Sequence, residues 1–360
     1  MIYENKDQLK KGCEATLSHE GGDVRILDEE RFRSRLIDDL IQTVAFSPDQ
    51  GTRKAAGFLI RRGAAALGIV SSSIQALYDA MGRGEVGGFT VPAINIRGIS
   101  YDVAQAVFRA AMAGNVGPVL FEIARSEIDY TRQRPLEYTC AVTAAAVKTG
   151  WRGPIFLQGD HFQVKAAKYK TDPEGAIKEV KDLIKDAVPA GFWNIDIDTS
   201  TLVDLSRPTP AQQQETNYTL AAELTTMIRD LEPAGITISV GGEIGEVGGK
   251  NSTVEELAAF MAGYREELKK IGPAMKGISK EAPWPGARCG WMEVYNADKD
   301  PIFNRFINTI LHQKMSEVCS TTLPQMAIPK IMTHPEYKNY LRARTQHYEK
   351  LSTIAYGILK

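Results

Sequence analysis

An acidic residue and a histidine stand side by side where an apolar run ends. Asp160 and His161 follow the sequence Ile-Phe-Leu-Gln-Gly at 155–159. A carboxylate can transfer protons, and a neutral imidazole is a common zinc ligand. Adjacent residues of an extended chain point in different directions, so His161 could bind a metal while Asp160 moves a proton. The alternative is that the pair satisfies backbone groups of a loop.

Two later segments also run from apolar residues into carboxylates. One carries Asp196 and Asp198 in Asn-Ile-Asp-Ile-Asp, and the other carries Glu243 after Ile-Ser-Val-Gly-Gly at 238–242. Asp196 and Asp198 share one side of a strand, and burying both without a partner would cost several kcal/mol. We therefore expect a cation, a hydrogen-bond network or solvent beside them. The alternative is a solvated strand end at which Thr199 and Ser200 begin an Asp-type turn.

A glycine-rich loop follows Glu243. Gly245, Gly248 and Gly249 could turn backbone N–H groups toward an anion such as phosphate, and Lys250 adds a positive charge. The spacing matches neither the dinucleotide-binding pattern nor a Walker loop. A flexible loop would explain the same glycines.

An alternation of strands and helices would position these groups. Apolar segments near 89–95, 118–123, 153–159, 192–198 and 236–243 alternate with helical patterns between them. The run 153–157 shows no alternation of apolar and polar residues, which is typical of a strand in a parallel sheet that is covered on both faces. Regular repetition favours a (β/α)8 TIM-type barrel over a doubly wound sheet, with polar groups at the carboxyl ends of the strands. We expect a helical extension at 1–80 and the barrel at 81–360.

Composition narrows the classes of partner. The chain has 360 residues, 43 basic and 44 acidic side chains and a net charge of -1. Without a basic field, nucleic acid and anionic membrane are unfavoured, so we expect a small ligand. The four cysteines form no CxxC pair, which is compatible with a reducing cytoplasm. No signal peptide or stretch of ~20 apolar residues is visible.

Several of these segments together resemble the class II, metal-dependent fructose-bisphosphate aldolases and their ketose-bisphosphate relatives. The resemblance covers about 78–265. It implies a lyase of carbohydrate metabolism, such as glycolysis, that reversibly cleaves a ketose bisphosphate such as fructose 1,6-bisphosphate into dihydroxyacetone phosphate and an aldehyde. It also implies a zinc ion, a monovalent cation and a homo-oligomer. The segments that carry it are 81–95, 118–122, 157–161, 194–198 and 242–249.

The resemblance also implies roles for single residues. His161 matches the first of three zinc-binding histidines, and Asp160 matches the carboxylate that protonates the aldehyde oxygen. Asp196 or Asp198, together with Glu243, matches acids associated with an alternative metal position. Ala124 stands where the family has a phosphate-binding serine, so the neighbouring arginine could replace that contact. The substrate-binding residues implied are Asn95, Arg125, Ser126, Gly248, Gly249 and Lys250.

The chain departs from the family after residue 276. The Ser-His-Gly and His-Gly-Gly elements that supply the other two zinc histidines are not visible in 277–360. His312, His334 and His347 remain there, and we predict that they are surface or core residues. Two alternatives stay open: a non-catalytic relative that binds a sugar phosphate or a partner, and a hydrolase that uses magnesium on Asp196, Asp198 and Glu243.

Overall fold

The computed structural model describes residues 1–20, 22–245, 251–271, 274–277, 292–295, 300–315 and 339. The chain divides into two compact units, Met1–Leu268 and Lys269–Lys360. In the second unit, β9 (Ala274–Gly277) pairs antiparallel with β10 (Met292–Tyr295), and α14 (Pro301–Met315) is a helix. The division at residue 80 stays a prediction. All the predicted site residues within the described ranges lie in the first unit.

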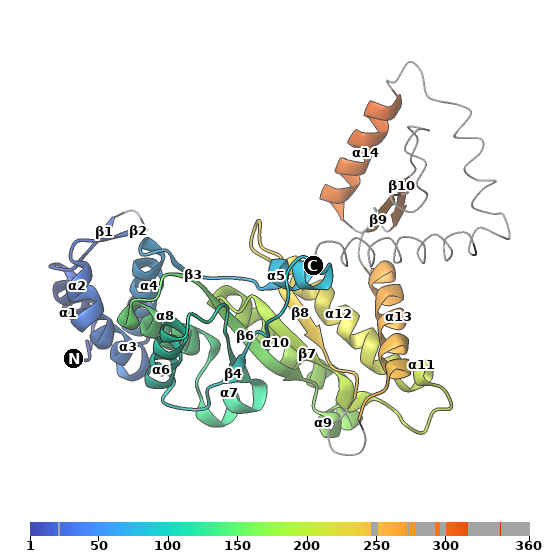
Figure 1. Ribbon diagram of the computed structural model, residues 1–360, viewed down its shortest axis with the longest axis horizontal. Helices are drawn as coiled ribbons and strands as arrows, with labels where there is room; N and C mark the ends of the chain where they lie inside the picture. Colours follow the sequence, from blue (N-terminus) through green and yellow to red (C-terminus); the bar gives the residue numbers. More distant parts are fainter. Residues whose placement is uncertain are drawn as a thin grey trace. The chain divides into compact units, whose positions relative to one another are not determined.

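A parallel sheet forms the centre of the first unit (Figure 1). Its strands follow one another in chain order: β4 (Ala93–Asn95), β5 (Leu120–Ala124), β6 (Gly153–Gln163), β7 (Asn194–Asp198) and β8 (Ser239–Gly242). A sixth strand, β3 (Ile69–Ser71), pairs with the first residues of β6. This confirms the α/β class and the parallel pairing.

The crossover helices lie in one layer. Helix α6 packs on α8, α8 on α10 and α10 on α12, so successive helices are neighbours on the same side of the sheet. Sequential strands with helices on one side are typical of an arc of a (β/α) barrel. The described residues form no closed barrel, and closure stays a prediction. The helices after β4 are α6 (Ser100–Ala113), α7 (Arg125–Thr131), α8 (Pro135–Thr149), α9 (Ala166–Thr171), α10 (Pro173–Ala190), α11 (Pro210–Gln213), α12 (Glu215–Leu231) and α13 (Val254–Ile271), with a 3-10 turn η2 (Ser200–Leu202).

The two faces of the sheet differ in chemistry. One face carries Leu157 and Ile195, which are buried in the core beneath the helices. On the other face, the register aligns a row of polar side chains, because paired residues of parallel strands share a face. Strands β5 and β7 are buried along their whole length, and they bury one polar residue and three polar residues respectively. Burial along β6 alternates, so the prediction that the run 153–157 is covered on both faces was wrong for that strand. The polar row is Asn95, Glu122, Gln158, Asn194 and Ser239.

The N-terminal region is mostly helical, and its helices α3 and α4 contact α8. That it is a separate extension stays a prediction. Leu36, Ile37 and Leu40 are buried at helical spacing. A hairpin and β3 were not predicted. The elements are α1 (Lys6–Cys13), β1 (Leu17–Glu20), β2 (Asp23–Ile26), α2 (Glu29–Arg31), a π-helical turn η1 (Phe32–Leu36), α3 (Ile37–Phe46), α4 (Gln50–Ala66) and α5 (Gln75–Gly82).

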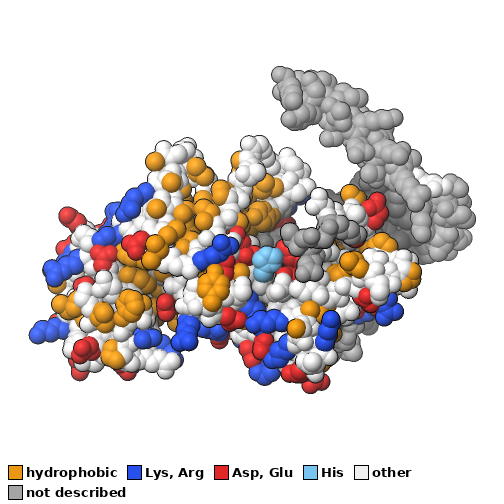
Figure 2. Space-filling model, turned by 90° about the horizontal axis from the view of Figure 1, so that it is seen from below, with side chains coloured by type: hydrophobic (Ala, Val, Ile, Leu, Met, Phe, Trp, Pro, Cys, Tyr) orange, Lys and Arg blue, Asp and Glu red, His pale blue; other side chains and the backbone are white. Residues whose placement is uncertain are grey.

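Charges of both signs are interspersed on the face drawn in Figure 2. This agrees with the near-balance of acidic and basic residues in the sequence. Within the described ranges, no helix is long and apolar enough to cross a bilayer.

Strand β6 contains an extra residue relative to β7. Gly159 pairs with Ile195 and Phe162 pairs with Ile197, so Asp160 and His161 together stand opposite one residue. His161 has a φ of 43°, in the left-handed region that histidine enters more readily than most residues. Such a β-bulge bends a strand and re-aims its side chains.

The bulge depends on the residues that flank it. The Phe162 side chain is fully buried, and a Cβ on Gly159 would lie 2.4 Å from its ring. Glycine is therefore required where the chain passes over this ring. The sequence Gly-Asp-His-Phe thus combines a small residue, two polar groups and a buried anchor.

Replacing this glycine should displace the ring. We expect Gly159→Ala to lower the free energy of unfolding by about 1–3 kcal/mol, the usual cost of overpacking, measured by urea unfolding. Gly117→Ala is the matched control, because a Cβ there meets nothing within 4 Å. Equal stability of the two variants would contradict the proposed packing of the bulge.

Candidate active site

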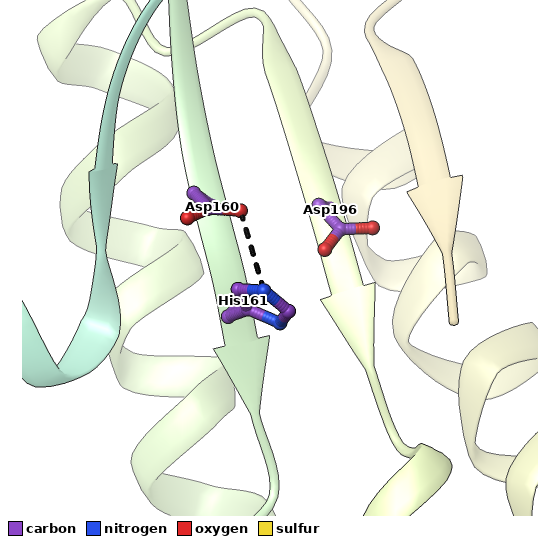
Figure 3. Close-up of side chains that lie close together, drawn as sticks. All are labelled: Asp160, His161 and Asp196. Carbon is purple, nitrogen blue, oxygen red and sulfur yellow. Dashed lines mark ion pairs between the residues drawn. The ribbon is translucent and has the colours of Figure 1, made fainter. Parts of the chain in front are cut away.

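The bulge brings Asp160, His161 and Asp196 into one cluster at the carboxyl edge of the sheet. One ligand atom from each residue lies within 4.8 Å of the others. Figure 3 shows Asp160 and His161 on β6 and Asp196 on β7, with Nε2 of His161 3.8 Å from Oδ1 of Asp160. The expectation that adjacent side chains would point apart was wrong here, because the bulge turns both toward one point.

Asp198 contacts the imidazole ring of His161 at Nδ1, the nitrogen that does not face Asp160. Its Oδ2 lies 3.0 Å from Nδ1 of His161 and accepts a hydrogen bond from Gln163 Nε2 at 2.6 Å. Its Oδ1 accepts from the backbone N–H and the hydroxyl of Ser200 at 3.1 and 2.8 Å. Both carboxylate oxygens are therefore occupied. The structure places Asp198 as the partner of His161, and its role as a metal ligand stays a prediction.

Asp196 is a buried carboxylate, and its side chain has no hydrogen-bond donor among the described residues. Burial raises its pKa to about 7, and the negative charges of Glu243, Asp198 and Asp160 add to the shift. On the next strand it faces Gly241, where a Cβ would lie 2.8 Å from its Oδ1. A buried acid without a donor can be stabilised by a proton or by a cation.

The pKa of His161 is raised. Partial burial alone would lower it, but the hydrogen bond with Asp198 and the charges of Asp160 and Asp196 outweigh burial. The imidazole therefore holds its proton more tightly than a free histidine does, and a metal ion must displace that proton in order to bind.

Asp160 is held by a chain of polar contacts from the first two strands. The Asn95 amide donates to Asp160 Oδ2 at 2.8 Å and to Glu127 Oε2 at 3.1 Å. Glu127 is buried and also accepts from the Arg97 guanidinium and from the Ala124 N–H. These contacts orient the Asn95 amide, which in turn fixes one oxygen of Asp160.

Sequence reasoning missed three residues of this neighbourhood: Arg97, Glu122 and Glu127. Glu122 is buried beside Gln158, whose amide donates to its Oε2 at 2.6 Å. Burial raises the pKa of Glu122 to about 7, and the charge of Asp160 adds to the shift. The polar residues that follow Ile94 and Phe121 were the available signal, but the register that aligns them is visible only in the folded sheet.

Glu243 lies just after β8 and shares this acidic environment. Burial raises its pKa, and the charges of Asp198 and Asp160 add to the shift. Its backbone carbonyl accepts from the Asn217 amide at 2.8 Å. Helix α12 thereby fixes the end of the strand that carries this glutamate.

Two predicted substrate-binding residues lie outside the cluster. Arg125 is buried and donates to the Gln163 carbonyl and to Glu179, so its guanidinium already has partners. Ser126 is exposed in the first turn of α7. Their contact with substrate stays a prediction, whereas Asn95 does reach the cluster.

The other predicted residues fall outside the description. Gly248, Gly249 and Lys250 are beyond the described residues, as are His334 and His347. His312 lies in α14, of which only the backbone is described at that point. Among the described residues, the metal-ligating atoms at the site come from one histidine and from carboxylates.

Comparison with known proteins gives three findings. A family model described as fructose-bisphosphate aldolase class-II matches residues 75–272. An uncharacterized aminotransferase from Methanocaldococcus jannaschii is 61% identical over 89 residues, which are 25% of this chain and 21% of that protein, so the match spans about a fifth of the relative. A crystal structure of a probable tagatose 6 phosphate kinase from Sinorhizobium meliloti 1021 is similar with a TM-score of 0.38 and 23% identity, covering 50% of this chain and 45% of that chain.

The raised pKa of Asp196 predicts a pH-dependent stability. The unfolded carboxyl ionises near 3.8, whereas the folded one keeps its proton to about 7. The unfolded state therefore binds fewer protons over this range, and folding stability falls as the pH rises from about 4 to about 7. In chelator, Asp196→Asn should lose less stability between pH 5 and pH 8 than the wild-type chain does, as measured by urea unfolding.

Asp204→Asn serves as the control, because Asp204 is exposed and hydrogen bonds from Ser206 lower its pKa. That substitution should not flatten the pH curve. Parallel curves for the wild-type and Asp196→Asn chains would contradict the burial of an uncompensated acid.

Proposed function

The chain belongs to the class II fructose-bisphosphate aldolase family, and from this premise we propose that it reversibly cleaves a ketose bisphosphate, such as fructose 1,6-bisphosphate, to dihydroxyacetone phosphate and an aldehyde. The observation that carries the proposal is the cluster of Asp160, His161 and Asp196 at the carboxyl edge of a parallel sheet. Edges of this kind bear the active sites of barrel enzymes.

The donor set fits a divalent cation. His161 offers Nε2, because Nδ1 is engaged by Asp198, and Asp196 offers a buried carboxylate with no donor among the described residues. An imidazole nitrogen with carboxylate oxygens suits zinc, and carboxylates also suit magnesium or manganese. A divalent ion held there would supply positive charge against the enediolate that aldol cleavage leaves. Zinc is the ion that we propose.

Asp160 is the proposed proton-transfer group. In the cleavage direction it accepts the proton of the hydroxyl next to the breaking carbon–carbon bond, and in condensation it returns this proton to the aldehyde oxygen. The Asn95 amide occupies its Oδ2, which leaves Oδ1 for this work, 3.8 Å from the histidine. The contacts of Asn95 with Glu127 keep the carboxylate in place before substrate arrives.

Asp198 is proposed to position His161. A histidine whose Nδ1–H points at a carboxylate has its tautomer and ring orientation fixed, so that Nε2 carries the free lone pair. The buried Asp198 is suited to this role, because Ser200 and Gln163 orient its carboxylate. The division of labour among the carboxylates then follows from their contacts: Asp160 moves the proton, Asp196 offers ligand oxygens and Asp198 orients the ring.

The proposal is tested by metal content and cleavage together. Purified chain should contain a divalent metal and cleave fructose 1,6-bisphosphate in a chelator-sensitive way. His161→Ala should lose metal and activity together, whereas Asp160→Asn should keep metal and lose about 10²–10⁴-fold in kcat. His19→Ala is the histidine control, since His19 packs against Phe58 in the N-terminal region.

Three results would count against this proposal. Equal loss of metal in Asp160→Asn and His161→Ala would overturn the division of roles. A folded, metal-free and inactive wild-type chain would overturn the catalytic function and favour a sugar-phosphate-binding relative. Chelator-sensitive phosphate release without aldol cleavage would favour a hydrolase.

The role of Asp198 has a separate test with a closely matched control. Asp198→Asn should weaken metal binding about 10–100-fold, the usual effect of removing a carboxylate behind a ligating histidine, as measured by titration calorimetry. Asp204→Asn breaks the same kind of turn, because Asp204 also accepts from the N–H and hydroxyl of the serine two residues on. If both variants bind metal equally well, Asp198 only closes the turn with Ser200, and its proposed role in positioning His161 is wrong.

A further inference from the structure

A polar hollow lies in the N-terminal region, lined by residues of α1, α2, η1 and α3. Figure 1 shows where helices α1, α2 and α3 lie. Its volume is about 490 Å³, within the range of small-molecule sites. The side chains that matter for its chemistry are Tyr3, Lys11, Thr16, Arg31, Arg35 and Asp39. None of them belongs to the cluster on β6 and β7.

The hydroxyl of Tyr3 has no hydrogen-bond partner among the described residues, and its oxygen is open to the hollow. The residue is 4% exposed, and its backbone N–H donates to Thr43 Oγ1 at 3.0 Å, which fixes its position. Its ring lies against Gly12, where a Cβ would come within 2.2 Å of the hydroxyl oxygen. Burial raises its pKa to about 12, and the charge of Asp39 adds to the shift, so the hydroxyl keeps its proton as a donor. A tyrosine so buried usually has a hydrogen-bond partner.

Thr16 adds a second unsatisfied hydroxyl to the lining. The residue is 0% exposed, and its Oγ1 has no hydrogen-bond partner among the described residues. Buried polar groups without partners are uncommon in folded proteins, and each costs stability. The lining therefore contains one buried hydroxyl without a partner, that of Thr16, and one hydroxyl that is open to the hollow, that of Tyr3.

The charges around the hollow are mostly positive. Lys11, Arg31 and Arg35 line it, and their side chains make no ion pair or hydrogen bond within the described part of the chain. The acidic residue of the lining, Asp39, is paired with the Met1 ammonium group. The hollow thus offers unpaired cations and hydroxyl donors, while its carboxylate already has an ion-pair partner.

We propose that this hollow binds a small phosphate-bearing anion. Guanidinium groups match phosphate oxygens in a bidentate geometry, and a lysine adds a point charge. The Tyr3 hydroxyl supplies a neutral donor from the floor of the hollow. The site lies in the N-terminal elements and does not rest on the aldolase function.

The test is titration calorimetry on the full chain with inorganic phosphate and with glycerol 3-phosphate. Wild-type chain should bind at least one of them, and the variant Arg31→Gln/Arg35→Gln should bind roughly tenfold or more weakly, because two charge-assisted contacts are removed. Tyr3→Phe should weaken binding several-fold and leave the charge unchanged. Tighter binding of the ester than of phosphate would show that the hollow also contacts the organic part, and equal binding would show an anion site alone.

Two controls separate this site from other effects. Arg25→Gln removes one exposed cation from β2, outside the lining, and should leave binding within about twofold. His161→Ala should also keep the binding, because it alters only the sheet cluster. The proposal is overturned if neither anion binds at millimolar concentration, if Arg25→Gln weakens binding as much as the double variant, or if His161→Ala abolishes it.

Discussion

In the β-bulge, two residues of β6 stand opposite one residue of β7. This pairing determines which way the Asp160 and His161 side chains point. In a regular strand, Asp160 and His161 would face opposite sides, and one of them would lie in the apolar layer beneath the helices. The bulge turns both toward Asp196, and the buried Phe162 anchors it from the apolar side. The orientation by Asp198 and the contact of Asn95 with Asp160 both depend on this local geometry.

The second constraint is electrostatic. Asp196 and Glu122 are buried acids with pKa values raised to about 7, and burial also raises the pKa of Glu243. One imidazole supplies the nearby positive charge that shifts these values down. Carboxylates gathered at this density stabilise an added cation and destabilise the site without one. The acidic face of the sheet therefore favours a bound cation, and within the polar row Asn95 orients Asp160.

Much of this arrangement could be predicted from the sequence. The apolar runs that end in Asp160, Asp198 and Glu243 predicted the positions of the strands and their parallel order. They also predicted that polar groups lie at the carboxyl ends of these strands. The period of two placed Asp196 and Asp198 on one side of a strand, but it could not separate their roles. That separation depends on the ring of His161, which reaches Asp198 only because its backbone adopts a positive φ.

Other parts could not be predicted, for physical reasons. The bulge is a property of two paired strands, so β6 alone does not reveal it. Glu127 contacts Asn95 from 32 residues away, through strand pairing that sequence spacing does not encode. The sequence predicted that Arg125 binds phosphate. In the structure its guanidinium is buried and donates to Glu179 of α10, a contact between residues 54 positions apart that the sequence does not reveal. Phosphate binding by the glycine-rich loop remains a prediction, because residues 246–250 lie outside the described ranges.

The central claim is that the bulge creates a divalent cation site between β6 and β7. The most direct measurement is a crystal structure of the chain grown with zinc, with anomalous diffraction recorded at the zinc edge. The account predicts an anomalous peak bonded to Nε2 of His161 and to a carboxylate oxygen of Asp196, with Asp198 still on Nδ1. A peak bonded through Nδ1, or no peak at this cluster while the strands keep their register, would contradict it.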